Sequence, residues 1–100
     1  MKTLLIDDLR DIKATVVVRT FEEGIDALKI QGPFDILYLD HDLGQETLYQ
    51  NEYSNDRTGY TIMCFLEEYS QYLPKDIIFV TSNPVGRKRM QVVKDRIYRK

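Results

Sequence analysis

An acidic pair, Asp7 and Asp8, ends the first apolar run of the chain, and the run "ILYL" ends at Asp40. Carboxylates that converge repel one another unless a cation neutralises them, and oxygen ligands of this kind suit Mg²⁺ or Mn²⁺. A lone buried carboxylate is costly, which makes Asp40 the strongest candidate ligand. We therefore expect Asp7, Asp8 and Asp40 to hold Mg²⁺ or Mn²⁺. Asp7 or Asp8 could instead cap the turn that follows.

His41 and Asp42 follow Asp40 directly and complete a candidate catalytic set. Histidine is the side chain that ordinarily titrates near neutral pH, so His41 could donate a proton to a leaving alkoxide or bind a phosphate oxygen. Strand alternation, however, would point His41 away from Asp40, and the histidine could be purely structural. Asp42 could likewise serve only to form a turn with Gly44.

Polar residues also end the last apolar run, where Thr81, Ser82 and Asn83 precede a predicted helix start. Hydroxyl and amide groups beside the free N–H groups of a helix start suit a phosphate. Arg87 and Lys88 lie one turn further on and could clamp the anion. This stretch therefore predicts a phosphate or nucleotide site.

The polar segment between Gly44 and Gly59 is too long and too weakly periodic for a predicted element. Loops of this length inside small domains are usually functional or disordered. Tyr53 could stack on a base and Arg57 could reach a phosphate. The alternative is an insertion with no role in binding.

Strand and helix signals alternate along the chain. Thr20 and Glu23 have the spacing of a capping box, and Asn83 with Pro84 has the pattern of a helix start. The expected strands are 2–6, 14–20, 35–39 and 76–82, and the expected helices are 20–30, 59–73 and 83 onward. The apolar residues expected to be buried in the last helix are Val85, Met90, Val93 and Ile97.

This alternation predicts a single α/β domain over residues 1–100, with a small, mostly parallel sheet and helices on both faces. Sites in such folds form at the carboxyl ends of the strands, so the polar strand ends should meet at one edge. Only residues 7–13 join the first two strands, which is short for a parallel crossover. The second strand could therefore be an antiparallel edge.

Composition narrows the class of protein. The chain of 100 residues has no long apolar run and no signal-peptide pattern, so we expect a cytoplasmic protein without a membrane span. Its single cysteine, Cys64, is expected in the core. Residues 1–84 carry seven Lys/Arg against fifteen Asp/Glu, whereas 85–100 carry seven against one. This basic tail could attract nucleic acid or could be a solvated face that balances the acidic body.

The motifs "LLIDD", "FDILYLDHDLG", "TGY" and "SNPVG" carry a resemblance. The acidic pair, the aspartate and the hydroxyl residue resemble the receiver domain of response regulators. Taken together, the motifs are similar to the divergent group described as cyclic-phosphate-processing receiver domains. The resemblance implies a receiver-like fold that acts on cyclic phosphates of RNA ends or nucleotides, and in this chain we expect the first helix and last strand to be reduced or absent.

Two departures leave other functions open. The last strand of an ordinary receiver, with its phosphoryl-contacting lysine, has no counterpart here. The histidine expected ahead of "SNP" is replaced by Val80 and Thr81. The first alternative is a non-catalytic protein that sequesters a nucleotide or cyclic oligonucleotide, as in phage–host conflict. The second is a stand-alone phosphoacceptor with Asp40 as its nucleophile.

Overall fold

Four short strands form one sheet in the computed structural model, which describes residues 1–43 and 58–99. The strands are β1 (Thr3–Ile6), β2 (Val16–Val18), β3 (Ile36–Leu39) and β4 (Asp76–Phe79). Their order is β2-β1-β3-β4, and every neighbouring pair is parallel. The possibility of an antiparallel second strand was therefore wrong: β2 is an edge strand, but it runs parallel to β1.

The helices are α1 (Phe21–Ile30), α2 (Gly59–Glu68) and α3 (Pro84–Tyr98), and the short 3₁₀ helix η3 (Ser70–Tyr72) follows α2. The predicted capping box is present, because Thr20 accepts from the Glu23 backbone and Glu23 bonds back to Thr20. Asn83 caps α3 as predicted. The predicted helix over 59–73 ends early, at Glu68, and the 3₁₀ turn replaces its last part.

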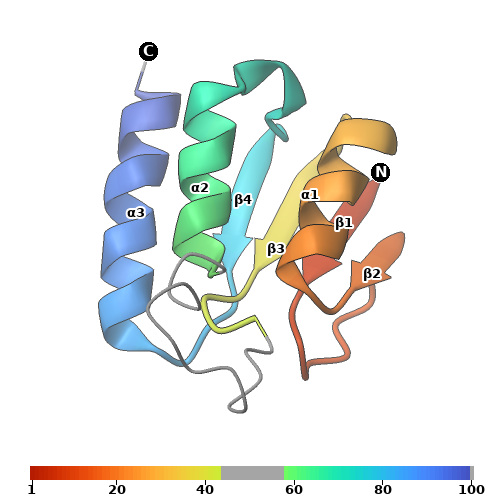
Figure 1. Cartoon of the computed structure of the whole chain (residues 1–100), viewed down its shortest axis with the longest axis horizontal. Helices are drawn as coiled ribbons and strands as arrows, with labels where there is room; N and C mark the ends of the chain where they lie inside the picture. The colour runs from red at the N-terminus through yellow and green to blue at the C-terminus, as the bar shows by residue number, and fades with distance from the viewer. Residues whose placement is uncertain (44–57, 100) are drawn as a thin grey trace.

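All three helices lie on one face of the sheet (Figure 1). The α/β class and the parallel sheet are confirmed, but the described residues place no helix on the second face, contrary to the prediction. The steps from β2 to β3 and from β3 to β4 go in the same direction across the sheet, so right-handed crossovers bring α1 and α2 to the same side. A helix between β1 and β2 would lie on the opposite side. Residues 7–15 form none, which confirms the expected loss of the first helix.

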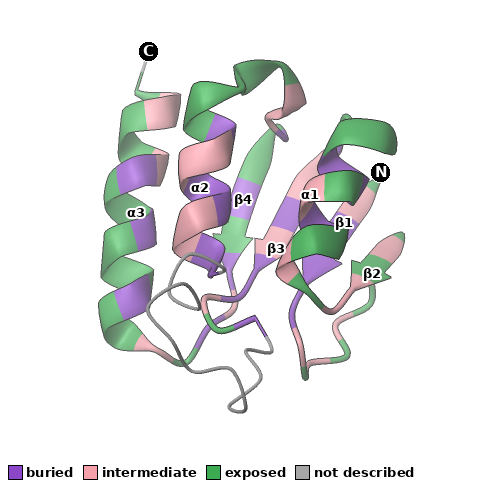
Figure 2. Cartoon of the chain, viewed as in Figure 1, coloured by how far each residue is buried: buried purple, intermediate pink, exposed green. Residues whose placement is uncertain are grey.

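The core lies between the sheet and these helices (Figure 2). Alternate strand residues such as Leu37, Leu39 and Ile77 face the helices and are fully buried. On the other face, Val17 and Ile78 remain 42% and 40% exposed. No helix among the described residues is long and apolar enough to span a membrane.

Two residues expected in the core, Val85 and Cys64, lie differently. Met90 and Val93 are buried in α3 and Ile97 is partly buried, but Val85 is 68% exposed. Val85 lies in the first turn of α3. Cys64 is only partly buried.

Candidate metal and phosphate site at the carboxyl edge

Three carboxylates meet where β1 and β3 end. The two strands are paired in register, with Ile6 opposite Leu39, so the residues that follow them emerge at the same level. One carboxylate oxygen from each of Asp7, Asp8 and Asp40 lies within 4.8 Å of the others. We call these three residues the acidic cluster. Asp7 is fully buried and Asp40 is 5% exposed.

Asp7 also organises the turn after β1. Its Oδ1 accepts hydrogen bonds from the backbone N–H groups of Leu9 at 3.0 Å and Arg10 at 3.2 Å. The expected turn-capping aspartate of the pair is therefore Asp7, while one of its oxygens still belongs to the acidic cluster. Arg19, which follows β2, stabilises this turn by donating hydrogen bonds to the carbonyl oxygens of Asp7 and Arg10.

Arg10 brings a cation into the acidic cluster. Its Nη1 lies 3.2 Å from Asp7 Oδ2 and 3.8 Å from Asp40 Oδ1, and its side chain is 37% exposed. The guanidinium therefore supplies part of the positive charge that a metal ion would supply. Sequence reasoning missed Arg10 because the connection after β1 has no periodic pattern. Only the fold brings the Arg10 side chain to the acidic cluster.

Asp40 has a raised pKa, chiefly because burial penalises its charged form. A hydrogen bond from the Thr81 side chain opposes this shift, the charge of Asp7 adds to it, and the His41 backbone N–H and Arg10 oppose it. The His41 N–H donates to Asp40 Oδ1 at 2.8 Å. The raised pKa means that Arg10 and the hydrogen bonds do not fully offset the cost of burying the charged Asp40 carboxylate. A divalent cation would offset it.

His41 is turned toward the first turn of α3. Its Nδ1 lies 3.0 Å from Asp42 Oδ1 and 3.4 Å from Asn83 Nδ2, and its Nε2 is buried without a hydrogen-bond partner in the described structure. The Asp42 side chain is 60% exposed. His41 and Asp42 therefore pair with each other, and neither side chain is part of the acidic cluster.

The residues before α3 connect the cluster to the helix start. Thr81 is 4% exposed, and its Oγ1 accepts from the Asn83 backbone N–H at 3.1 Å. Asn83 Oδ1 accepts from the Gly86 N–H at 3.0 Å, and Arg87 Nη2 donates to the Thr81 carbonyl at 2.9 Å. Thr81 contacts Asp40 directly, so it joins the cluster, and Arg87 is anchored at the same edge.

Four other candidate residues remain. Ser82 and Lys88 are exposed. Tyr53 and Arg57, with the rest of the predicted loop, lie outside the described residues.

Two glycines allow the helix starts to approach these residues. A Cβ at Gly59 would lie 2.2 Å from the backbone oxygen of Asp40, and a Cβ at Gly86 would lie 2.5 Å from the ring of His41. The glycines of "TGY" and "SNPVG" thus let α2 and α3 pack directly on the end of β3. The motif residues therefore have a structural role as well as any chemical one.

Part of the basic tail pairs with the acidic body. Arg96 makes two hydrogen bonds to Glu67, at 2.6 and 2.8 Å, and these lower the pKa of Glu67. Lys94 lies 3.2 Å from Asp76. The described contacts thus support the interpretation that the basic residues of α3 form a solvated face whose positive charge balances the acidic rest of the domain.

A family model described as the cyclic-phosphate processing receiver domain matches residues 2–96. The chain belongs to this family. The match covers all the described elements except the end of α3, including the acidic cluster and the α3 start. No curated protein and no solved structure gives a significant match. Membership confirms the resemblance seen in the motifs and the receiver-like fold class.

Proposed function

We propose that this receiver domain processes a cyclic phosphate, on an RNA end or a cyclic nucleotide, with Mg²⁺ or Mn²⁺ held by the acidic cluster. The observation that carries the proposal is the approach of three carboxylate oxygens to within 4.8 Å at the carboxyl edge of a parallel sheet. Oxygen-only ligands suit hard divalent cations. Burial and the charge of Asp7 raise the pKa of Asp40, and a bound cation would favour the charged form of this carboxylate.

A bound Mg²⁺ or Mn²⁺ would polarise a phosphoryl oxygen and lower the pKa of a coordinated water. The protein's own groups would orient the phosphate. The Thr81 side chain bonds to Asp40, but Pro84 has no N–H and the Gly86 N–H is already bound to Asn83. The α3 start therefore offers few backbone donors, and we assign Arg87 the larger part in holding the anion.

We assign proton handling to Asp42 rather than to His41. The Asp42 carboxylate is 60% exposed, whereas His41 Nε2 is buried. The 3.0 Å contact between His41 Nδ1 and Asp42 Oδ1 would position the carboxylate. His41 itself is fixed by its packing on Gly86.

Three observations favour a second candidate, a protein that binds a cyclic phosphate without turnover. Val80 and Thr81 stand where the family resemblance implies a histidine, and His41 does not present its free nitrogen at the surface. In addition, Arg10 already neutralises part of the acidic cluster and could contact a bound phosphate directly.

The experiment is a panel of RNA 2′,3′-cyclic ends, cyclic mononucleotides and cyclic dinucleotides, incubated with the protein and Mg²⁺ or Mn²⁺. Chromatography and mass spectrometry would detect ring opening, and thermal shift would detect binding. Asp40→Asn removes one candidate ligand, and Asp26→Asn changes an exposed aspartate on α1 as the matched control.

Ring opening that Asp40→Asn abolishes and Asp26→Asn retains would support the enzyme. A ligand that binds and is recovered intact would support the second candidate. If no member of the panel binds or opens, the proposed function is wrong.

A further inference from the structure

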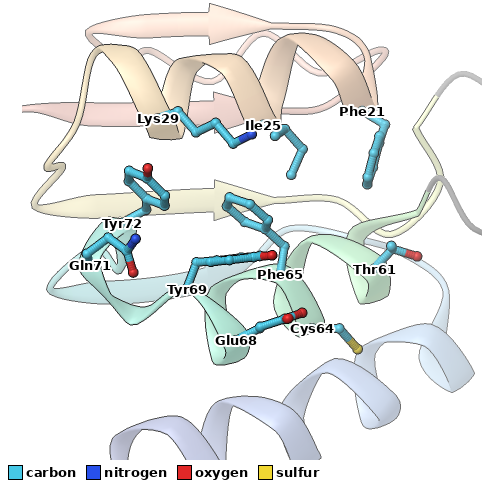
Figure 3. Close-up of a pocket in the computed structure, with 10 residues that line it drawn as sticks. All are labelled: Phe21, Ile25, Lys29, Thr61, Cys64, Phe65, Glu68, Tyr69, Gln71 and Tyr72. Carbon is cyan, nitrogen blue, oxygen red and sulfur yellow. The ribbon is translucent and has the colours of Figure 1, made fainter.

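An open hollow lies between α1 and α2, with a volume of about 630 Å³ (Figure 3). It is lined by residues from both helices and from η3: Phe21, Ile25, Lys29, Thr61, Cys64, Phe65, Glu68, Tyr69, Gln71 and Tyr72. None of them belongs to the acidic cluster or to the α3 start. The hollow is therefore a separate feature, and its volume lies in the range of small-molecule sites.

Aromatic rings form much of its surface. The rings of Phe65 and Tyr72 are nearly parallel, with an interplanar angle of 6° and centroids 5.8 Å apart. Tyr69 adds a third ring, 5.1 Å from Phe65, and is 42% exposed. Phe21 projects from α1 on the opposite side (Figure 3). Partly exposed rings gathered in one place often mark a binding surface.

The polar groups of the hollow differ between its two walls. Lys29 extends from α1 and places its Nζ 5.7 Å from the centre of the Phe65 ring. The opposite wall carries the carboxylate of Glu68 and the amide of Gln71 (Figure 3). The hollow thus combines flat aromatic faces, one cation, and both hydrogen-bond donors and acceptors.

We propose that this hollow binds the base of a nucleotide, with the base stacked on the exposed ring of Tyr69 and an anionic group near Lys29. A nucleobase is planar, and any base can stack on an aromatic side chain. Its edge carries donors and acceptors that Glu68 and Gln71 can satisfy. The ammonium of Lys29, now over the Phe65 ring, would move to the phosphate. This site goes beyond the proposed function because it shares no residue with the acidic cluster.

The test is calorimetric titration of the full chain with adenosine, guanosine, AMP, GMP and ribose 5-phosphate in the absence of divalent metal. Tyr69→Ala should weaken base binding about tenfold, the effect of losing one stacking surface. Tyr60→Ala is the matched control, since Tyr60 lies on α2 but outside the hollow and stacks with Arg89, 4.2 Å from its ring centre. Circular dichroism would confirm that both variants fold.

A second pair of variants tests the cation. AMP should bind more tightly than adenosine by a few fold, and Lys29→Gln should remove this preference while leaving adenosine binding in place. Lys75→Gln, a change at an 83% exposed lysine outside the hollow, should keep the preference. Asp40→Asn should leave adenosine binding unchanged, so a failure of the metal site and a failure of this site give different results.

Four binding results would overturn the proposal. These are the absence of saturable binding by any base-containing probe, equal binding of ribose 5-phosphate, equal losses in Tyr69→Ala and Tyr60→Ala, or loss of adenosine binding in Asp40→Asn. The last would place the base at the carboxyl edge. A dimer that Tyr69→Ala converts to monomer would show that a second copy occupies the hollow, and would also overturn it.

Discussion

Replacing Arg10 with glutamine should tighten metal binding, because the Arg10 guanidinium lies within the acidic cluster and competes there with a metal ion. Its Nη1 lies 3.2 Å from Asp7 and 3.8 Å from Asp40, and a divalent cation bound by both carboxylates would displace it. Glutamine keeps most of the length of the side chain and removes the charge. The backbone N–H of residue 10 that bonds to Asp7 is retained.

The size of the effect follows from these two contacts. Unit charges 4 Å apart interact by about 1 kcal/mol in water and by about 4 kcal/mol at an effective dielectric constant of about 20. The Arg10 side chain is 37% exposed, so the lower value applies. Exposed ion pairs contribute about 0–1 kcal/mol each, so displacing Arg10 from two carboxylates costs up to about 2 kcal/mol. At about 1.4 kcal/mol per tenfold change, Arg10→Gln should bind metal more tightly by up to about 30 times.

The assay is calorimetric titration of Mg²⁺ or Mn²⁺ at fixed pH and ionic strength, supported by thermal unfolding. Without metal, Arg10→Gln should be less stable than the wild type, because the acidic cluster loses its counter-charge. Metal at about ten times its Kd adds about 1.4 kcal/mol of stability, or roughly 6–11 °C in Tm for a domain of this size. The variant should therefore recover when metal is added.

Arg96→Gln is the matched control, since Arg96 pairs with Glu67 and belongs to α3. Its metal affinity should equal that of the wild type. If a folded Arg10→Gln binds metal no more tightly than the wild type, Arg10 does not compete with the cation and the reasoning fails. If Asp40→Asn and the wild type bind equally weakly, the acidic cluster is not a metal site.

Three further predictions concern stability, each measured by urea unfolding without metal. Burial raises the pKa of Asp40 in the folded state above the ordinary value of 3.8. The contribution of Asp40 to the free energy of unfolding is therefore fully present below pH 3.8 and is lost as the pH rises through the folded-state pKa. Asp40→Asn should gain stability relative to the wild type over that window, and parallel pH curves would contradict this. Gly59→Ala should cost the upper part of the about 1–3 kcal/mol typical of overpacking, because its Cβ would meet a backbone oxygen at 2.2 Å. Gly24→Ala, whose Cβ would meet the Ile6 side chain at 2.7 Å rather than a backbone atom, should cost less than Gly59→Ala, since alanine favours the helix by about 1 kcal/mol; equal costs would refute the comparison. Asn83→Ala should lose about 1 kcal/mol through the missing cap on α3, Asn83→Asp should retain most of it, and an unchanged Asn83→Ala would show that the cap is dispensable.

The predictions that the structure confirms depended on local hydrogen bonding and on residue type. The Thr20 cap needs only Glu23, three residues away, and the Asn83 cap needs only the next turn. Alternating apolar runs and amphipathic segments set the α/β class. Because parallel strands end at one edge, the convergence of Asp7, Asp8 and Asp40 also followed from the sequence.

The arrangement of groups distant in sequence was decided only by the tertiary structure. The helices α1 and α2 share one face because successive right-handed crossovers step in one direction across the sheet. The strand order that sets this direction does not follow from any local sequence pattern. The insertion of Arg10 between two carboxylates, the turn of His41 toward Gly86, and the hollow between α1 and α2 depend on the same packing. The sequence alone determined which chemical groups reach the carboxyl edge, since residue type and strand position are local properties. Only the fold decided which of them touch, because contact depends on the register, handedness and packing of the whole chain.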